Sequence, residues 1–185
     1  MEAARILYRR GAMGRATQWV LARKRIDAAA VDADAGVEEV LRGRYGEIEL
    51  PLLEDAGKVV AGLRPIVSYL ERTYGPPSVF PEDSQKRNQA VTLAEFAEQA
   101  LGAAVAKLET ELGWRGTLLA ELRALLDRTR EGIGRGALDS GACHLGDIAV
   151  AAVLVDCRAV RELDFERHYA DLDAYVERVQ RALRG

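Results

Sequence analysis

The chain has 185 residues, of which 49% are hydrophobic and 30% are charged, and its formal net charge is −3. These values are typical of a globular protein with a sizeable core, and the slight negative charge speaks against general nucleic-acid or membrane binding. Two cysteines, Cys143 and Cys157, form neither a disulfide framework nor a metal-ligand cluster. With no apolar leader and no membrane-spanning stretch in the sequence, we expect a cytoplasmic protein.

The first 45 residues predict a strand, a helix, a second strand and a short helix. The strand is Ile6 to Tyr8, followed by a basic, glycine-containing loop from Arg9 to Gly14. A helix is expected over 16–22 with a basic C-terminal end, which suits the helix dipole. A weak strand over 28–31, a turn at 34–36 and a helical piece over 37–41 follow.

Residues 49–75 give the clearest pattern in the chain. Two short apolar runs, at 50–53 and at 59–60, flank a turn at 55–58, which predicts a β-hairpin. Pro51 at the start of the first run needs either an edge position or a special peptide geometry such as cis. Pro65 then suits the first turn of a helix that Gly75 ends.

The second half of the chain predicts helices only. The proline-rich segment 76–82 has the composition of a linker, and Asp83 or Ser84 can cap a helix that runs to about residue 112. A second amphipathic helix is expected over 118–126, ended by Gly132 and Gly134, and a loop extends to Gly141. Residues 148–155 are apolar on every side, which indicates the buried helix at the centre of this part.

These elements resemble the glutathione transferase superfamily along nearly the whole chain. Leu50-Pro51-Leu52-Leu53 is similar to the family's Val-Pro-Val-Leu-like strand, and His144-Leu145-Gly146-Asp147 stands at its Ser/Thr-x-x-Asp capping box. Tyr169 to Tyr175 is similar to its closing Tyr-Pro-x-Leu-x-x-Trp run. The resemblance implies a thioredoxin-like α/β domain over 1–75, a linker over 76–82, an all-helical bundle over 83–185, and a homodimer.

The resemblance also implies a site where one hydroxyl or thiol group stabilises the thiolate of glutathione. In the register of bacterial members reading Leu-Tyr-Tyr-Ser-Pro-Gly-Ala-Cys-Ser, Met13 and Gly14 stand at the Cys and Ser, and neither can donate to a thiolate. Other classes of the family have a tyrosine that ends the first strand and is followed by a Gly-Arg pair, like Gly14-Arg15 here, so the resemblance makes Tyr8 the candidate catalytic residue. Its alternative role is that of an ordinary aromatic side chain at the end of a strand.

The ligand-binding residues that the resemblance implies surround the first helix and the hairpin. Leu50 would contribute its backbone beside Pro51, whereas Gly62 and Leu63 stand where the family has the Glu-Ser pair that holds the γ-glutamyl group. The N–H groups of that helix start and Arg64 remain to bind a carboxylate. In the first loop Arg9, Arg10 and Arg15 form either a positive funnel for an anion or a solvated basic edge. The expected ligand site comprises Arg10, Gly11, Met13, Leu50, Pro51, Gly62, Leu63 and Arg64.

Two functions remain open at this stage. One is a transferase-like enzyme that conjugates glutathione, as co-substrate, or a related thiol to a small apolar electrophile, with no metal. In it the second-substrate pocket would include Phe96, Gln99 and Trp114, although packing in the helical core explains Phe96 equally well. The other is a non-catalytic binding or assembly module of the same fold, with a divergent active site that has lost its thiol-activating residue.

Overall fold

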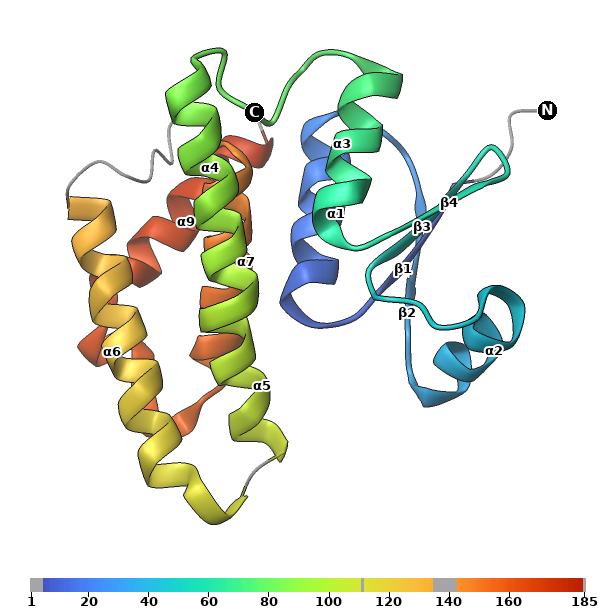
Figure 1. Cartoon of the computed structure of the whole chain (residues 1–185). Coiled ribbons are helices and arrows are strands. Elements are labelled where there is room, and N and C mark those ends of the chain that lie inside the picture. Colours follow the sequence, from blue (N-terminus) through green and yellow to red (C-terminus); the bar gives the residue numbers. More distant parts are fainter. Residues whose placement is uncertain (1–4, 111, 135–142, 185) are drawn as a thin grey trace. The chain divides into compact units, whose positions relative to one another are not determined.

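The computed structural model describes residues 5–110, 112–134 and 143–184, which form two compact units (Figure 1). The first unit extends to Val79 and the second begins at Phe80. The loop expected up to Gly141 lies outside the described residues. None of the helices in the described ranges is both long enough and apolar enough to cross a bilayer.

The first unit is a four-stranded mixed sheet with three helices. Its sheet has the order β2-β1-β3-β4, in which β1 pairs with β2 in parallel and with β3 antiparallel. Helices α1 and α3 lie together on one side of the sheet, and α2 lies on the other (Figure 1). This is the expected thioredoxin-like α/β arrangement, and its elements in chain order are β1 (Ile6–Arg9), α1 (Gly11–Arg23), β2 (Ala29–Asp32), α2 (Ala35–Tyr45), β3 (Leu52–Asp55), β4 (Lys58–Ala61) and α3 (Leu63–Tyr74).

The predicted hairpin is confirmed as β3 and β4. Ala56 and Gly57, the two residues between the strands, both have positive φ angles, +49° and +81°. A two-residue turn of this kind matches the right-handed twist of the strands that it joins. It aligns Leu53 with Val60, and on the other side Leu53 pairs with Leu7 of β1, so that the buried leucines meet in the middle of the sheet.

The predicted loop from Arg9 to Gly14 is wrong, because α1 already begins at Gly11. Gly14 lies inside this helix and is buried against β1. A Cβ atom at Gly14 would lie 2.7 Å from the Cβ atom of Arg9, so this glycine permits the close approach of helix and strand. Its presence reflects packing rather than a turn.

Two buried polar groups hold the first unit together. The Asp55 carboxylate is 2% exposed; it accepts a hydrogen bond from the Tyr69 hydroxyl at 3.0 Å and another from Tyr74, and pairs with Arg5 at 3.1 Å. The Lys24 ammonium at the end of α1 donates to Glu71 Oε1 (3.0 Å) and to the carbonyl oxygens of Gly75 (2.6 Å) and Pro77 (3.0 Å). Because each charge has several partners, both are tolerated inside the unit.

In its described residues the second unit contains helices and no strand, as expected. Asp83 caps its first helix by accepting a hydrogen bond from the backbone N–H of Lys86 at 2.8 Å. This helix continues through a π-helical segment, Ala97–Gly102, into α5, and a short 3₁₀ turn, Leu112–Trp114, leads to α6. The helices are α4 (Ser84–Phe96), α5 (Ala103–Thr110), α6 (Arg115–Gly134), α7 (Leu145–Arg158), α8 (Phe165–His168) and α9 (Ala170–Arg184).

Helix α7 is the buried centre of the second unit, as its apolar sequence predicts. Gly146 allows it to approach α4 closely, since a Cβ atom there would lie 2.9 Å from the Cβ atom of Leu93. The Asp147 carboxylate accepts hydrogen bonds from the backbone N–H of His144 (3.1 Å) and from the Tyr175 hydroxyl of α9 (2.7 Å). Burial, reinforced by Asp147, raises the pKa of Tyr175. The expected carboxylate of the capping box is therefore present, and it also anchors α9.

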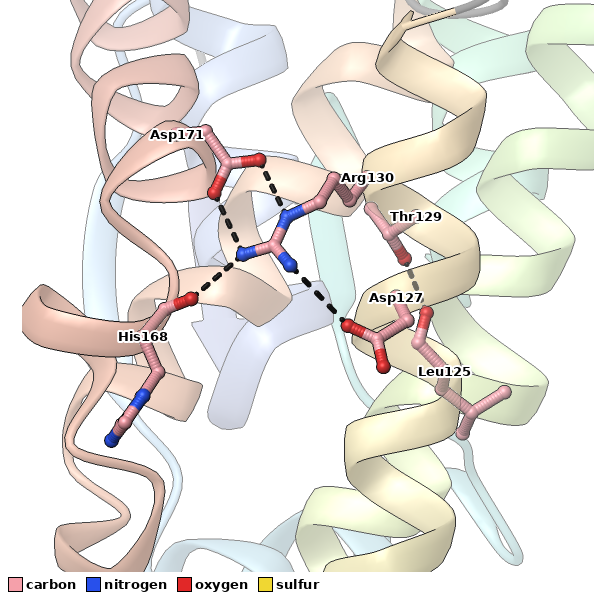
Figure 2. Close-up of polar contacts among 6 residues, drawn as sticks. All are labelled: Leu125, Asp127, Thr129, Arg130, His168 and Asp171. Atoms are coloured by element: carbon pink, nitrogen blue, oxygen red, sulfur yellow. Dashed lines mark hydrogen bonds and ion pairs between the residues drawn. The ribbon is translucent and has the colours of Figure 1, made fainter.

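A cluster around Arg130 ties α6 to the last two helices (Figure 2). The Arg130 guanidinium binds both carboxylate oxygens of Asp171, at 2.7 and 2.9 Å, and donates to the backbone carbonyl of His168 at 2.7 Å. It also approaches Asp127 at 3.4 Å on its own helix. Hydrogen bonds from Arg130 lower the pKa of Asp171, which shows that the pairing favours the charged carboxylate.

Candidate functional site

A cavity of about 240 Å³ lies in the first unit, between the start of α1, helix α2 and the segment before β3. Arg10 precedes α1, whereas Glu38 and Arg42 lie one turn apart on α2. Ile48 and Leu50 contribute from the extended segment that leads to Pro51. The cavity therefore combines three charged residues with two apolar ones.

Positively charged side chains outnumber negatively charged ones in the lining of this cavity. The Arg10 guanidinium forms an ion pair of 2.5 Å with the Glu38 carboxylate. Among the described residues, the one ionic contact of Arg42 is a distant one, 3.9 Å from Glu47, whose side chain is 93% exposed. Two guanidinium groups thus face one carboxylate, and the excess positive charge suits an anionic ligand.

The backbone next to the cavity has the geometry that the sequence suggested for Pro51. The Leu50–Pro51 peptide bond is cis, and the carbonyl of Pro51 accepts a hydrogen bond of 2.7 Å from the N–H of Gly62. Gly62 has a φ angle of +82° and caps α3 without a side-chain hydrogen bond. The hairpin start and the N-terminus of α3 are therefore adjacent, as the expected ligand site requires.

The other expected ligand residues occupy different environments. Leu63 is 1% exposed and belongs to the core, whereas Arg64 is exposed on α3. Gly11 is exposed and Met13 is half-buried in the first turn of α1, and neither lines the cavity. The structure brings Arg10 and Leu50 together in one cavity and places Gly62 beside Pro51.

Sequence reasoning missed three lining residues, Glu38, Arg42 and Ile48. The spacing of Glu38 and Arg42 on one helical face was the available signal, but this spacing is also common on solvated helices. A carboxylate outside the lining, that of Glu49, lies 3.5 Å from the position of a Cβ atom built on Gly62. Glu49 thus places a negative charge close to the start of α3.

Tyr8 lies in the middle of the sheet and does not line the cavity. Partial burial raises its pKa, and the charge and hydrogen bond of Glu54 raise it further. The Glu54 carboxylate also accepts a hydrogen bond of 2.7 Å from Tyr45 and contacts Arg44 at 3.5 Å. The Tyr8 hydroxyl is therefore a weakened acid in a polar cluster with Glu54.

The basic residues before and within α1 are largely paired. Arg9 binds Asp32 at 2.8 Å, its partner in the register of β1 and β2, and donates to Gln18. Arg10 is held by Glu38, as described above. Arg10 is thus the member of the suggested funnel that contributes to the cavity.

The expected second-substrate residues lie apart in the second unit. Phe96, at the end of α4, lines a separate cavity of about 160 Å³. Gln99 is exposed on the π-helical segment, and Trp114 is 71% exposed in the short 3₁₀ turn. Neither of these two lines that cavity.

Among the described residues, no three His, Cys, Asp or Glu side chains are grouped so as to hold a metal ion. Both cysteines are free and buried, at 1% exposure for Cys143 and 0% for Cys157. Cys157, near the end of α7, therefore packs as a small apolar residue of the helical core.

Comparison with known proteins shows what fold this chain shares with them. No family model matches the chain. Protein IN2-1 homolog A of Oryza sativa subsp. japonica is 25% identical over 144 residues, a match that covers 74% of this chain and 58% of that protein. The chain thus spans little more than half the length of this curated relative.

Two solved structures show the likeness over nearly the entire chain. A delta-class glutathione transferase of Nilaparvata lugens has a TM-score of 0.79 at 20% identity, and the match covers 98% of this chain and 90% of that one. A glutathione transferase family member of Pseudomonas fluorescens Pf-5, with bound glutathione, has a TM-score of 0.73 at 21% identity. That match covers 98% of this chain and 97% of the other.

Proposed function

We propose that this chain, which has the fold of the glutathione transferases, binds glutathione or a related anionic thiol in the cavity beside Leu50. The observation that carries the proposal is that two arginines, Arg10 and Arg42, line one cavity together with Leu50, the residue before Pro51. Glutathione carries two carboxylates, one ammonium group and a peptide backbone. Arginine side chains suit the carboxylates, and backbone N–H and C=O groups suit the peptide backbone.

The groups in the cavity, together with the nearby start of α3 and Glu49, fit the parts of such a ligand one by one. Arg42, whose carboxylate neighbour Glu47 is distant and exposed, would hold one carboxylate of the ligand. The backbone of Leu50 would pair with the peptide, and the N–H groups of the α3 start would face the other carboxylate. Glu49, close to that helix start, would face the ammonium group of the γ-glutamyl residue.

We place binding ahead of conjugation because the lining lacks the hydroxyl or thiol donor that the family resemblance implies for the thiolate. None of the described lining residues carries a hydroxyl or a thiol. Tyr8, the catalytic candidate, has a raised pKa and a carboxylate neighbour. Its proton is therefore held more tightly and is shared with Glu54, which opposes donation to a sulfur anion.

Conjugation of the thiol to a small apolar electrophile is the second candidate function. The names of the two solved structures favour it, since both are described as glutathione transferases. In this reaction the thiolate sulfur forms a bond to an electrophilic carbon. Either a leaving group departs from that carbon with its bonding electrons, or the electrons of a double bond move to the neighbouring atom, which takes up a proton. Tyr8 would have to exchange its bond to Glu54 for one to the thiolate.

Calorimetric titration with glutathione tests the proposed binding. We expect heat of binding at millimolar glutathione, and a roughly five- to twentyfold weaker Kd in Arg42→Gln and in Arg10→Gln, as for the loss of a charge-assisted hydrogen bond. Arg44→Gln is the matched control, because Arg44 is on the same helix but outside the cavity. Absence of heat from the wild type at millimolar ligand would refute the proposal.

A conjugation assay with a general electrophilic acceptor separates the two candidates. If the chain is a binding module, glutathione and the acceptor react no faster with the protein than without it, and this holds for the wild type and for Tyr8→Phe. Turnover that is lost in Tyr8→Phe, while the Kd is kept, would establish the transferase. The homodimer implied by the family resemblance stays a proposal, which light scattering coupled to size exclusion tests.

A further inference from the structure

The cavity of about 160 Å³ in the helical unit is built by three helices. Thr92, Leu93 and Phe96 come from α4, Arg128 and Gly132 from α6, and Val150 from α7. Thr129 also lines it, but its hydroxyl donates to the carbonyl of Leu125 at 2.8 Å and is therefore satisfied (Figure 2). The walls are chiefly apolar, and the volume is close to the roughly 150 Å³ known to accommodate benzene in an engineered protein cavity.

Arg128 adds a positive charge to this apolar space. Its guanidinium lies over the Phe96 ring, 5.2 Å from the centroid. Within the described residues it makes no ion pair and no hydrogen bond. Arg130, two residues further along α6, differs from Arg128 in this respect. Its guanidinium donates through Nε and Nη2 to the two carboxylate oxygens of Asp171 (Figure 2).

An aromatic ring in the cavity and an anion at its edge would satisfy both features. The ring would replace water along Leu93, Phe96 and Val150, a change that the hydrophobic effect favours. The anion would pair with a guanidinium that keeps its stacking on Phe96. The cavity volume limits the ligand to a single ring.

We propose that the cavity between α4, α6 and α7 binds a single-ring aromatic carboxylate, with the ring against Phe96 and the carboxylate on Arg128. The site is formed by residues of the helical unit alone and does not depend on the glutathione proposal. It goes beyond the sequence expectation for Phe96, since it adds Arg128 and requires an anionic rather than a purely apolar ligand.

Two probes, phenylacetate and its neutral counterpart phenylacetamide, test the proposal on the full wild-type chain. Binding is followed by titration of amide chemical shifts in NMR. We expect shifts at α4 and α6 residues around the cavity, and an affinity for phenylacetate about tenfold above that for phenylacetamide, the size of one charge-assisted contact at a partly exposed site. Equal affinities, or no shifts around the cavity, would overturn it.

Variants then assign the contacts. Arg128→Gln should remove the preference for the carboxylate, whereas Arg167→Gln, at an exposed arginine outside the cavity, should keep it. Gly132→Leu should weaken both probes at least tenfold by filling the space. Gly116→Leu is its control, because an added Cβ meets no atom within 4 Å at either glycine and Gly116 lies outside the lining. If Arg128→Gln still prefers phenylacetate to phenylacetamide, the assignment of the carboxylate to Arg128 is refuted. Gly132→Leu should bind glutathione as the wild type does, because the two sites are formed by different residues.

Discussion

At the scale of single residues, Lys24 shows how the first unit tolerates a buried charge. Its side chain is 1% exposed, and its ammonium group has three oxygen partners at 2.6 to 3.0 Å. Two of these oxygens are backbone carbonyls just after α3, so Lys24 fixes the end of α1 to the chain that leaves the unit. Removing the ammonium group leaves all three acceptors with one partner fewer.

We predict that Lys24→Met lowers the free energy of unfolding by about 2–4 kcal/mol, since a buried charge network loses its central donor. Urea denaturation followed by circular dichroism measures the change. Lys107→Met, at an exposed lysine of α5, is the control and should change stability by less than about 0.5 kcal/mol. A Lys24→Met variant as stable as this control would contradict the role of the network.

Glu71 makes the stability of this network dependent on pH. Burial alone would raise its pKa, but hydrogen bonds from Ser78, the backbone of Val79 and Lys24 outweigh burial and lower it from the ordinary value of 4.5. A carboxyl group with a lowered folded-state pKa stabilises the protein above its unfolded pKa. This contribution is lost as the pH falls through the folded value.

We therefore predict that the wild type loses stability between about pH 4.5 and the lower folded pKa of Glu71 more steeply than Glu71→Gln does. Urea titrations at several pH values from neutral to acid measure the two slopes. Glu47→Gln, at a side chain that is 93% exposed, serves as the control. Parallel slopes for the wild type and Glu71→Gln would contradict the prediction.

Cys157 offers a residue-scale test of the helical core. Burial, with a smaller contribution from the charge of Asp156, raises the pKa of its thiol to about 12. Because the thiolate is the reactive form, the native thiol should react slowly with a disulfide reagent at pH 8. Cys143 is equally buried, so both thiols should react fully only after unfolding in urea. Rapid native reaction of either would show that the core opens.

At the scale of elements, the Arg130 cluster (Asp127, Arg130, His168 and Asp171) joins helices that are distant in sequence. Its bidentate geometry is the arrangement in which a surface ion pair contributes measurably to stability. The pair is partly exposed, 40% for Arg130 and 52% for Asp171, so its contribution is reduced by solvent.

We predict that Arg130→Met lowers the stability of the helical unit by about 1 kcal/mol, and that salt at molar concentration reduces this difference. Thermal unfolding with and without salt measures both effects. Arg167→Met, whose side chain is 79% exposed and 4.0 Å from Asp164, is the matched control and should be neutral. Equal melting temperatures for the two variants would indicate that the cluster contributes nothing.

At the scale of the whole molecule, net charge and local charge differ in sign. The chain carries −3 overall, while the cavity of the first unit has an excess guanidinium group. Attraction of an anionic thiol therefore depends on Arg10 and Arg42 and not on the overall field. Raising the salt from about 0.05 to 0.5 M should weaken glutathione binding several-fold in the wild type and much less in Arg42→Gln.

How much of the molecule the sequence predicts depends on whether the signal is local. The hairpin was predictable because the apolar runs and the turn at Ala56-Gly57 are neighbours, and α7 because it is apolar on all sides. The start of α1 was not predictable, because Gly14 has the appearance of a turn residue in the sequence but serves to let α1 approach Arg9 closely. A glycine in a turn and a glycine at a close contact look the same in the sequence, and the structure distinguishes them.

The candidate site was predictable to a smaller extent for the same reason. Pro51 stood out because a proline at the head of a strand is a local anomaly, whereas the expected role of Leu50 followed from the family resemblance. Arg42 and Glu38 have the pattern of any solvated helix, and their place in the cavity follows from how α2 lies against the segment before β3. The pairing of Arg9 with Asp32 likewise depends on the register of two strands that lie apart in sequence.

The π-helical segment Ala97–Gly102 has a consequence for how this chain could change. A π turn holds one more residue than the α turn that it interrupts. The surplus residue is therefore absorbed within the turn and does not rotate the helix that follows. Val105 and Leu108 of α5 keep their buried orientation although the chain carries this residue. Deleting one residue from 97–102 should convert the segment into an unbroken α-helix and leave the face that α5 presents to the core nearly unchanged.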